Sequence, residues 1–224
     1  MGGPTWDAYC ARWTSLHGGF DPRRAPVWVR MWQRFAFAVA RGLVRMKVSP
    51  STVTTAGLCC ALLVPLAVLL GGGFLFLATA LVVLAALADS ADSGVAVISN
   101  RTSAAGSFYD SVADRCSELA WLVALWLVGA PVALVVACGA LTLLHEYARS
   151  RAALAGMPKV AAGTIAERST RVLAVVGALL LGAVANLVSA HLAAGVVTVA
   201  VAIWLVLALL SAVRFVGAVR ATLE

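Results

Sequence analysis

Apolar residues form six long blocks along the 224-residue chain, each close to the length of a membrane-spanning helix. A hydrocarbon core about 30 Å thick is crossed by roughly 20 helical residues. The pattern therefore predicts six transmembrane helices, at about residues 51–70, 74–99, 106–128, 131–153, 171–189 and 192–214. Short turns at 71–73, 129–131 and 189–191 join these helices in pairs, and each turn contains glycine, proline or serine.

The segment before the first block has an amphipathic pattern. At 100° per residue, Arg30, Arg34, Arg41 and Arg45 share one helical face, and Trp28, Trp32, Phe35, Val39, Leu43 and Met46 share the opposite one. This predicts an interfacial helix over residues 27–46 that lies on an anionic membrane surface. A solvated helix on a soluble core is the alternative, and the chain offers no such core. Ser49 and Pro50 then predict an N-cap and first position for the first spanning helix.

Composition supports a membrane protein and excludes a soluble globule. The chain is 62% hydrophobic and 12% charged, with a mean hydropathy of +0.96. We therefore expect an all-α polytopic membrane protein with a cytoplasmic N-terminal segment (1–48), a six-helix catalytic domain (49–215) and a cytoplasmic tail (216–224). The five cysteines show no CxxC pattern and no disulfide framework, and no signal peptide is predicted.

The positive charges predict the orientation in the membrane. All 17 Lys and Arg residues precede the first helix, border the second-to-third or fourth-to-fifth connection, or end the chain. These positions lie on one side of the six-helix map, so the positive-inside rule places both termini on the cytoplasmic side of the cell membrane. The net charge of +7 follows from this asymmetry. Nucleic-acid binding is a poor explanation, because the charges border spanning helices.

Four aspartates interrupt the apolar blocks near that same side: Asp89, Asp92, Asp110 and Asp114. Each charge at membrane depth costs about 2.5–3.5 kcal/mol on insertion scales, so a neutralising partner is expected. Spacings of three and four residues place each pair on one face of its helix. Counting ~1.5 Å per residue from the far-side turns gives matched depths of about 22 Å and about 27–28 Å. The second and third helices should therefore bring the two pairs together.

Dense carboxylate oxygens favour Mg²⁺ or Mn²⁺ and leave coordination positions for substrate phosphates. Two such ions can stabilise the attacking and leaving oxygens of a phosphoryl transfer. The small residues Gly94, Ala96 and Gly106 next to the aspartates would let a ligand approach the backbone. Helix packing is the alternative explanation for the small residues.

The constellation resembles the CDP-alcohol phosphotransferase family of membrane enzymes. That family's motif reads D-x-x-D-G-x-x-A-R, followed by G-x-x-x-D-x-x-x-D. Six positions match it here: Asp89, Asp92, Ala96, Gly106, Asp110 and Asp114. The resemblance implies that the four aspartates and the donor diphosphate hold two divalent cations, with Asp114 as general base and CMP as leaving group. It also implies a homodimer. We expect a lipid donor such as CDP-diacylglycerol, because the site would open at the membrane surface.

Two motif positions differ from the family. Ser93 stands where the motif has its first glycine, and Gly94 comes directly after it. Val97 replaces the donor-contacting arginine. Arg101 would share the face of Val97 if the helix continues, and we expect it to substitute; anchoring at the membrane surface is the alternative. Ser51 and Thr54 resemble donor-contacting positions at the start of the first spanning helix.

A second group of cations surrounds the fourth-to-fifth connection: Arg149, Arg151, Lys159, Arg168 and Arg171. Residues 163–171 resemble a loop of actinobacterial phosphatidylinositol-phosphate synthases, and arginine binds phosphate through paired N–H donors. We therefore expect a phosphorylated polyol acceptor, such as inositol phosphate, with orientation and lipid contact as the alternative. His145 is expected to cap or pack, and Glu118 to support the aspartates.

Two other functions are compatible with the pattern. Buried carboxylates also suit a divalent-cation transporter, but the predicted far side offers only His191 as an ionisable group and no repeat is visible. A family member without activity is the second alternative, because of Ser93 and Val97.

Overall fold

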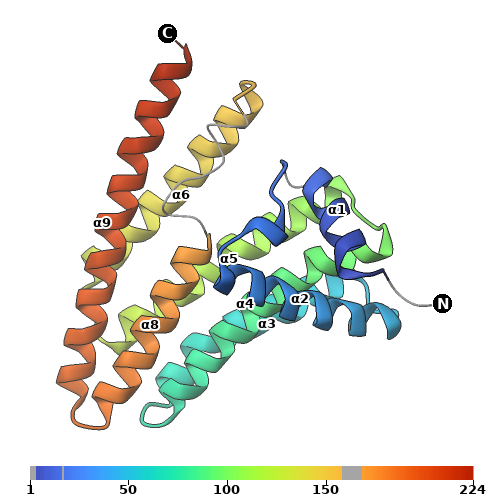
Figure 1. The fold of residues 1–224 in the computed structure, drawn as a ribbon. Coiled ribbons are helices and arrows are strands. Elements are labelled where there is room, and N and C mark those ends of the chain that lie inside the picture. The colour runs from blue at the N-terminus through green and yellow to red at the C-terminus, as the bar shows by residue number, and fades with distance from the viewer. Residues whose placement is uncertain (1–3, 17, 158–167, 224) are drawn as a thin grey trace. The chain divides into compact units, whose positions relative to one another are not determined.

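The computed structural model describes residues 4–16, 18–157 and 168–223, with the side chains of Arg168 and Leu223 excepted. Within these residues every regular element is helical (Figure 1). The elements are α1 (Trp6–Leu16), the short 3-10 helix η1 (Pro22–Arg24), α2 (Val27–Arg45), α3 (Pro50–Leu69), α4 (Phe74–Ser99), α5 (Ala104–Val128), α6 (Val132–Leu154), α8 (Arg168–Asn186) and α9 (Ala190–Leu223).

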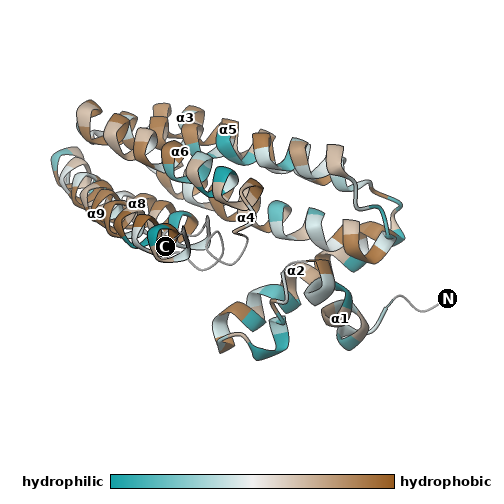
Figure 2. Cartoon of the chain, turned by 90° about the horizontal axis from the view of Figure 1, so that it is seen from above, coloured by the Kyte–Doolittle hydropathy of each residue, from teal (hydrophilic) through white to brown (hydrophobic). Residues whose placement is uncertain are grey.

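Among the described residues, five helices are long and apolar enough to cross a membrane: α3, α4, α6, α8 and α9. Apolar residues cover most of α3 and α9, whereas α1 and α2 are mixed (Figure 2). The prediction of an all-helical, multi-pass membrane protein is confirmed. Helix α5 has 25 residues but is not among the five, because it carries Asp110, Asp114, Arg115 and Glu118. The sixth span therefore stays a prediction.

Local capping explains where the spanning helices begin. Ser49 Oγ accepts a hydrogen bond from the Thr52 backbone N–H at 3.2 Å, so the predicted capped start of α3 is confirmed. Ser189 does the same for Leu192 before α9, at 3.1 Å. Helix α9 continues to Leu223, so the predicted tail is helical over residues 216–223.

The chain divides into two compact units. The first contains Met1–Cys60 and Leu84–Asp114, and its core has two clusters. One cluster joins α1 to α2 and α4 through Tyr9, Cys10, Trp13, Phe37 and Val97. The other joins α2, α3 and α4 through Ala40, Val53, Ala91 and Val95. The sequence had not predicted α1, whose burial raises the pKa of the Cys10 thiol to about 11 and keeps it neutral.

Helix α2 lies against α4 at two specific points within this unit. The Trp32 indole N–H donates to Ser90 Oγ at 2.9 Å. A Cβ placed on Gly94 would lie 2.9 Å from the Cβ of Ala40, so the crossing requires glycine. Elsewhere on α2, Trp28, Met31 and Phe35 are exposed.

The second unit contains Ala61–Val83 and Arg115–Glu224. In it α8 and α9 form a hairpin of adjacent helices, and α9 also packs against α6 (Figure 1). Close approach again depends on glycine, because a Cβ on Gly182 would lie 2.9 Å from Val197 Cγ2. Gly129 has a φ of +128°, and its Cβ would lie 2.6 Å from that of Ala194, so the turn between α5 and α6 tolerates no side chain.

Candidate metal and nucleotide site

Three helices of the first unit come close enough to share a site. Gly57 lets α3 pack closely against α4, because a Cβ on Gly57 would lie 2.9 Å from the Cβ of Ala88. Thr55 on α3 is hydrogen-bonded to the Tyr109 hydroxyl on α5 at 2.9 Å. Helix α3 therefore contacts both helices that carry the aspartates.

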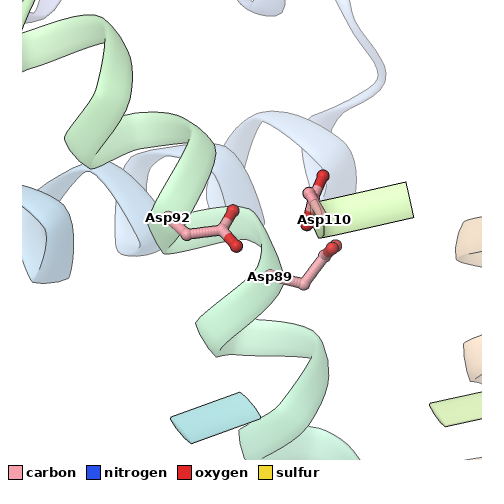
Figure 3. Close-up of side chains that lie close together, drawn as sticks. All are labelled: Asp89, Asp92 and Asp110. Carbon is pink, nitrogen blue, oxygen red and sulfur yellow. The ribbon is translucent and has the colours of Figure 1, made fainter. Parts of the chain in front are cut away.

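Asp89 and Asp92 from α4 and Asp110 from α5 converge (Figure 3). Each offers one carboxylate oxygen, and these oxygens all lie within 4.8 Å of one another. Asp92 is only 3% exposed, and Thr54 Oγ1 donates a hydrogen bond to its Oδ2 at 2.5 Å. This is the spacing of carboxylates around a shared divalent cation.

A second observation also indicates that these residues suit a divalent cation. Asp92 Oδ1 is buried and has no hydrogen-bond partner among the described residues. A buried carboxylate oxygen without a donor is costly, and two more carboxylates nearby increase the cost. A hard divalent cation would satisfy all three groups at once.

Asp114 lies one turn after Asp110 on the same face of α5 and is half-buried. It is not a member of the group of three described above. The predicted four-carboxylate site therefore consists of three converging oxygens and a fourth aspartate further along α5.

A cavity of about 630 Å³ adjoins the carboxylates in the same unit. Asp92 and Asp110 line it, and hydroxyl groups dominate the remaining polar lining. The hydroxyl-bearing residues are Ser49, Ser51, Thr54, Ser93, Thr102, Ser103 and Ser107. Hydroxyls and one arginine beside carboxylates form a polar cavity suited to a phosphate- and sugar-bearing ligand.

Five of the six predicted donor-binding residues line this cavity, namely Thr54, Ser93, Ala96, Arg101 and Gly106. Gly94 does not line it, because it faces Ala40 and the Tyr9 hydroxyl at the α2 crossing. The packing explanation for small residues therefore holds at Gly94.

Arg101 reaches the cavity by a different route from the expected one. Helix α4 ends at Ser99, and Asn100 adopts a left-handed φ of 57°. The Arg101 N–H then donates to the Ala96 carbonyl at 2.9 Å, which closes the helix end. Because α4 ends at the predicted residue, Arg101 does not share a helical face with Val97, and the α4–α5 connection directs it to the cavity instead.

The position of the missing motif arginine is apolar and enclosed. Val97 is 3% exposed and belongs to the cluster of Tyr9, Trp13 and Phe37. Val97 and Leu16, at the end of α1, both line the cavity with apolar side chains. Sequence reasoning missed both this helix and the hydroxyl groups of Ser49, Thr102, Ser103 and Ser107. The polar run at 99–107 was the available signal for the last three.

In the second unit, two of the predicted acceptor-binding arginines take part in an ion network. Arg171 is 2% exposed, and its Nε lies 2.8 Å from Glu118 Oε1. Its two terminal nitrogens donate to Glu146 Oε1, each at 3.0 Å. Arg149 donates to the same oxygen at 3.1 Å.

The other predicted acceptor residues have no described role. Arg151 is exposed in the last turn of α6, and only the backbone of Arg168 is described. Lys159 lies outside the described residues. His145 is buried with its ring edge-on to Phe215 at 5.4 Å, in agreement with packing. Glu118 pairs with Arg171 and with Arg115, whose Nη1 lies 3.1 Å from Glu118 Oε2.

Comparison with known proteins places these features in a family. A family model described as CDP-alcohol phosphatidyltransferase matches residues 47–207. The fold resembles a crystal structure of Mycobacterium tuberculosis phosphatidylinositol phosphate synthase with CDP-DAG bound, with a TM-score of 0.64 and 24% identity. That match covers 83% of this chain and 94% of the synthase chain.

A second structure of the same mycobacterial synthase, in complex with manganese and citrate, gives a TM-score of 0.65 at 23% identity. It covers 82% of this chain and 88% of that one. No curated protein sequence matches the chain.

Proposed function

Because this chain belongs to the CDP-alcohol phosphatidyltransferase family and is therefore a phosphatidyltransferase enzyme, we propose that it transfers a phosphatidyl group from CDP-diacylglycerol to an alcohol and releases CMP. One observation carries the proposal. Three carboxylates from two helices converge within 4.8 Å beside a hydroxyl-lined cavity of about 630 Å³.

The chemistry follows from the residues of this site. Asp89, Asp92 and Asp110 would hold divalent cations, either Mg²⁺ or Mn²⁺. The resemblance of the motif to the family suggests two such ions. When bound, these ions would neutralise the diphosphate charge of the donor. Thr54 orients Asp92 through its hydrogen bond, so one carboxylate oxygen stays directed at the site.

Asp114 would accept the proton of the acceptor hydroxyl as its oxygen attacks the phosphorus that bears the diacylglycerol. The bond from that phosphorus to the bridging oxygen breaks, and the electron pair leaves with CMP. A base on α5, one turn from Asp110, remains close to the reacting group without serving only as a cation ligand.

Arg101 would contact the donor diphosphate in place of the motif arginine. It lines the same cavity as Asp92 and Ser93. Val97 lines this cavity too, but its side chain is apolar and offers no hydrogen-bond donor. An arginine on the α4–α5 connection can donate two parallel hydrogen bonds to phosphate oxygens. Arg101→Ala should raise the donor KM about tenfold or more, as expected for loss of a charged hydrogen bond. An unchanged donor KM would contradict this role.

The arrangement in the membrane is part of the same proposal. Helix α5 would be the sixth span, with its charged half at the cytoplasmic surface and neutralised by cations and arginines. The exposed Trp28, Met31 and Phe35 on α2 support an interfacial helix that inserts this face among lipids. Both termini and the site would then be cytoplasmic, in the cell membrane. A homodimer is also proposed, from family resemblance alone.

The acceptor is an alcohol, and the second-unit arginines are the candidates to contact it. Arg149 and Arg171 carry guanidinium groups, which suit oxygen-rich polyols and phosphates. Arg151, Arg168 and Lys159 complete the proposed acceptor set.

CMP release is the decisive test. The full chain in detergent or vesicles is given CDP-diacylglycerol, a panel of alcohols, and Mg²⁺ or Mn²⁺. Asp114→Asn should abolish CMP release, and the matched control Asp7→Asn, an exposed acid on α1, should retain it. Absence of CMP release with every acceptor would favour an inactive family member. Metal uptake into vesicles without CMP release would favour a transporter.

A further inference from the structure

The second-unit arginines converge on a carboxylate that belongs to the chain itself. Glu146 Oε1 accepts hydrogen bonds from Arg149 Nη1 at 3.1 Å and from both terminal nitrogens of Arg171 at 3.0 Å. Arg115 Nη1 lies 3.9 Å from the same oxygen. Three guanidinium groups around one oxygen are the arrangement that arginines adopt around a phosphate.

This position differs in access from the rest of the network. The side chains of Glu146, Arg115 and Arg149 are 22%, 25% and 26% exposed. Those of Glu118 and Arg171 are 3% exposed. An anion from solution can therefore approach the Glu146 position, whereas the Glu118 position is enclosed.

The charges give the position a clear preference. Three arginines face two glutamates among the described members, and Glu146 supplies the charge that an external anion would otherwise bring. A phosphate placed there would meet a carboxylate at hydrogen-bonding distance from the same donors. Like charges side by side weaken binding strongly.

We propose that Glu146 is a specificity-determining residue that occupies the anion-binding position of this arginine cluster, so that the acceptor is an alcohol without a phosphate group. The inference rests on the proposed phosphatidyl transfer and revises the phosphorylated polyol expected from the arginines alone.

The first experiment compares acceptors. CMP release from CDP-diacylglycerol is measured with glycerol and inositol against glycerol 3-phosphate and inositol 1-phosphate. The wild type should favour the uncharged member of each pair by about tenfold or more in kcat/KM, and Glu146→Gln should reverse or abolish that preference. Equal or better use of phosphorylated acceptors by the wild type overturns the inference. If CMP is released with none of these acceptors, the proposed function itself is overturned.

The second experiment needs no activity. Inorganic phosphate is added during thermal unfolding of the wild type, Glu146→Gln and Glu118→Gln. Phosphate should raise the unfolding midpoint of Glu146→Gln only, because it refills an accessible anion position. Glu118→Gln is the matched control, because its carboxylate position is enclosed. If phosphate stabilises the wild type, or fails to stabilise Glu146→Gln, then Glu146 has only a structural role.

Discussion

Removal of Glu118 should destabilise the protein strongly, because it breaks a buried ion pair from one side. The Glu118 and Arg171 side chains are each 3% exposed, and they are joined at 2.8 Å. Loss of one partner from a buried pair costs about 3–5 kcal/mol. Arg171 keeps Glu146 at 3.0 Å, so we expect the lower end, about 3 kcal/mol, for Glu118→Ala.

For a chain of this size, that loss lowers the thermal unfolding midpoint by about 6–12 °C at about 2–4 °C per kcal/mol. The midpoint is measured in one detergent at one scan rate. The control is Asp7→Asn, which removes an exposed carboxylate 3.6 Å from Arg23 and should leave the midpoint unchanged.

A double variant separates charge from packing. Glu118→Leu combined with Arg171→Met replaces the whole buried pair by apolar groups of similar size, so most of the lost stability should return. The reasoning is refuted if Glu118→Ala shifts the midpoint by less than about 2 °C, within the range expected for ordinary surface changes. It is also refuted if the double variant is no more stable than the single one.

Three further predictions concern the first unit. Mn²⁺ at about 100 times its Kd should stabilise the wild type by about 2.7 kcal/mol in thermal unfolding, and Asp92→Asn should lose most of this gain. A chelator that left the wild-type midpoint unchanged would contradict a metal site. Gly94→Ala places a Cβ 2.9 Å from the Cβ of Ala40 on α2 and should lower the free energy of unfolding by about 1–3 kcal/mol. Gly42→Ala has open space and should be neutral or stabilising. Trp32→Phe removes the bond to Ser90 and should cost about 1 kcal/mol in the same assay.

The membrane character and the spanning helices could be predicted from local sequence. A spanning helix satisfies its own backbone hydrogen bonds, so its existence depends on a run of apolar residues and little else. The start of α3 is local too, because Ser49 caps the backbone of Thr52 three residues later. Helix α9 extended past its predicted end because its last residues contain no proline before Leu223, and the alanine and arginine residues among them are good helix formers.

The motif aspartates were predictable in type and spacing, but their grouping was not. Periodicity placed Asp89 and Asp92 on one helical face, and hairpin counting placed Asp110 opposite. Which carboxylates meet depends on the rotation and approach of two helices, and Gly57 and Thr55 control that through contacts with α4 and α5. The group of three, without Asp114, is a result of that packing.

The sequence by itself determined that a carboxylate site lies in an all-helical membrane enzyme, because spacing and hydropathy are local properties. Only the tertiary structure decided the roles of Val97, Arg101 and Glu146. Val97 is enclosed by α1, Arg101 reaches the cavity because α4 ends at Ser99, and Glu146 meets arginines from two other helices. Each role depends on residues far apart in the chain, and only packing of the helices brings those residues together.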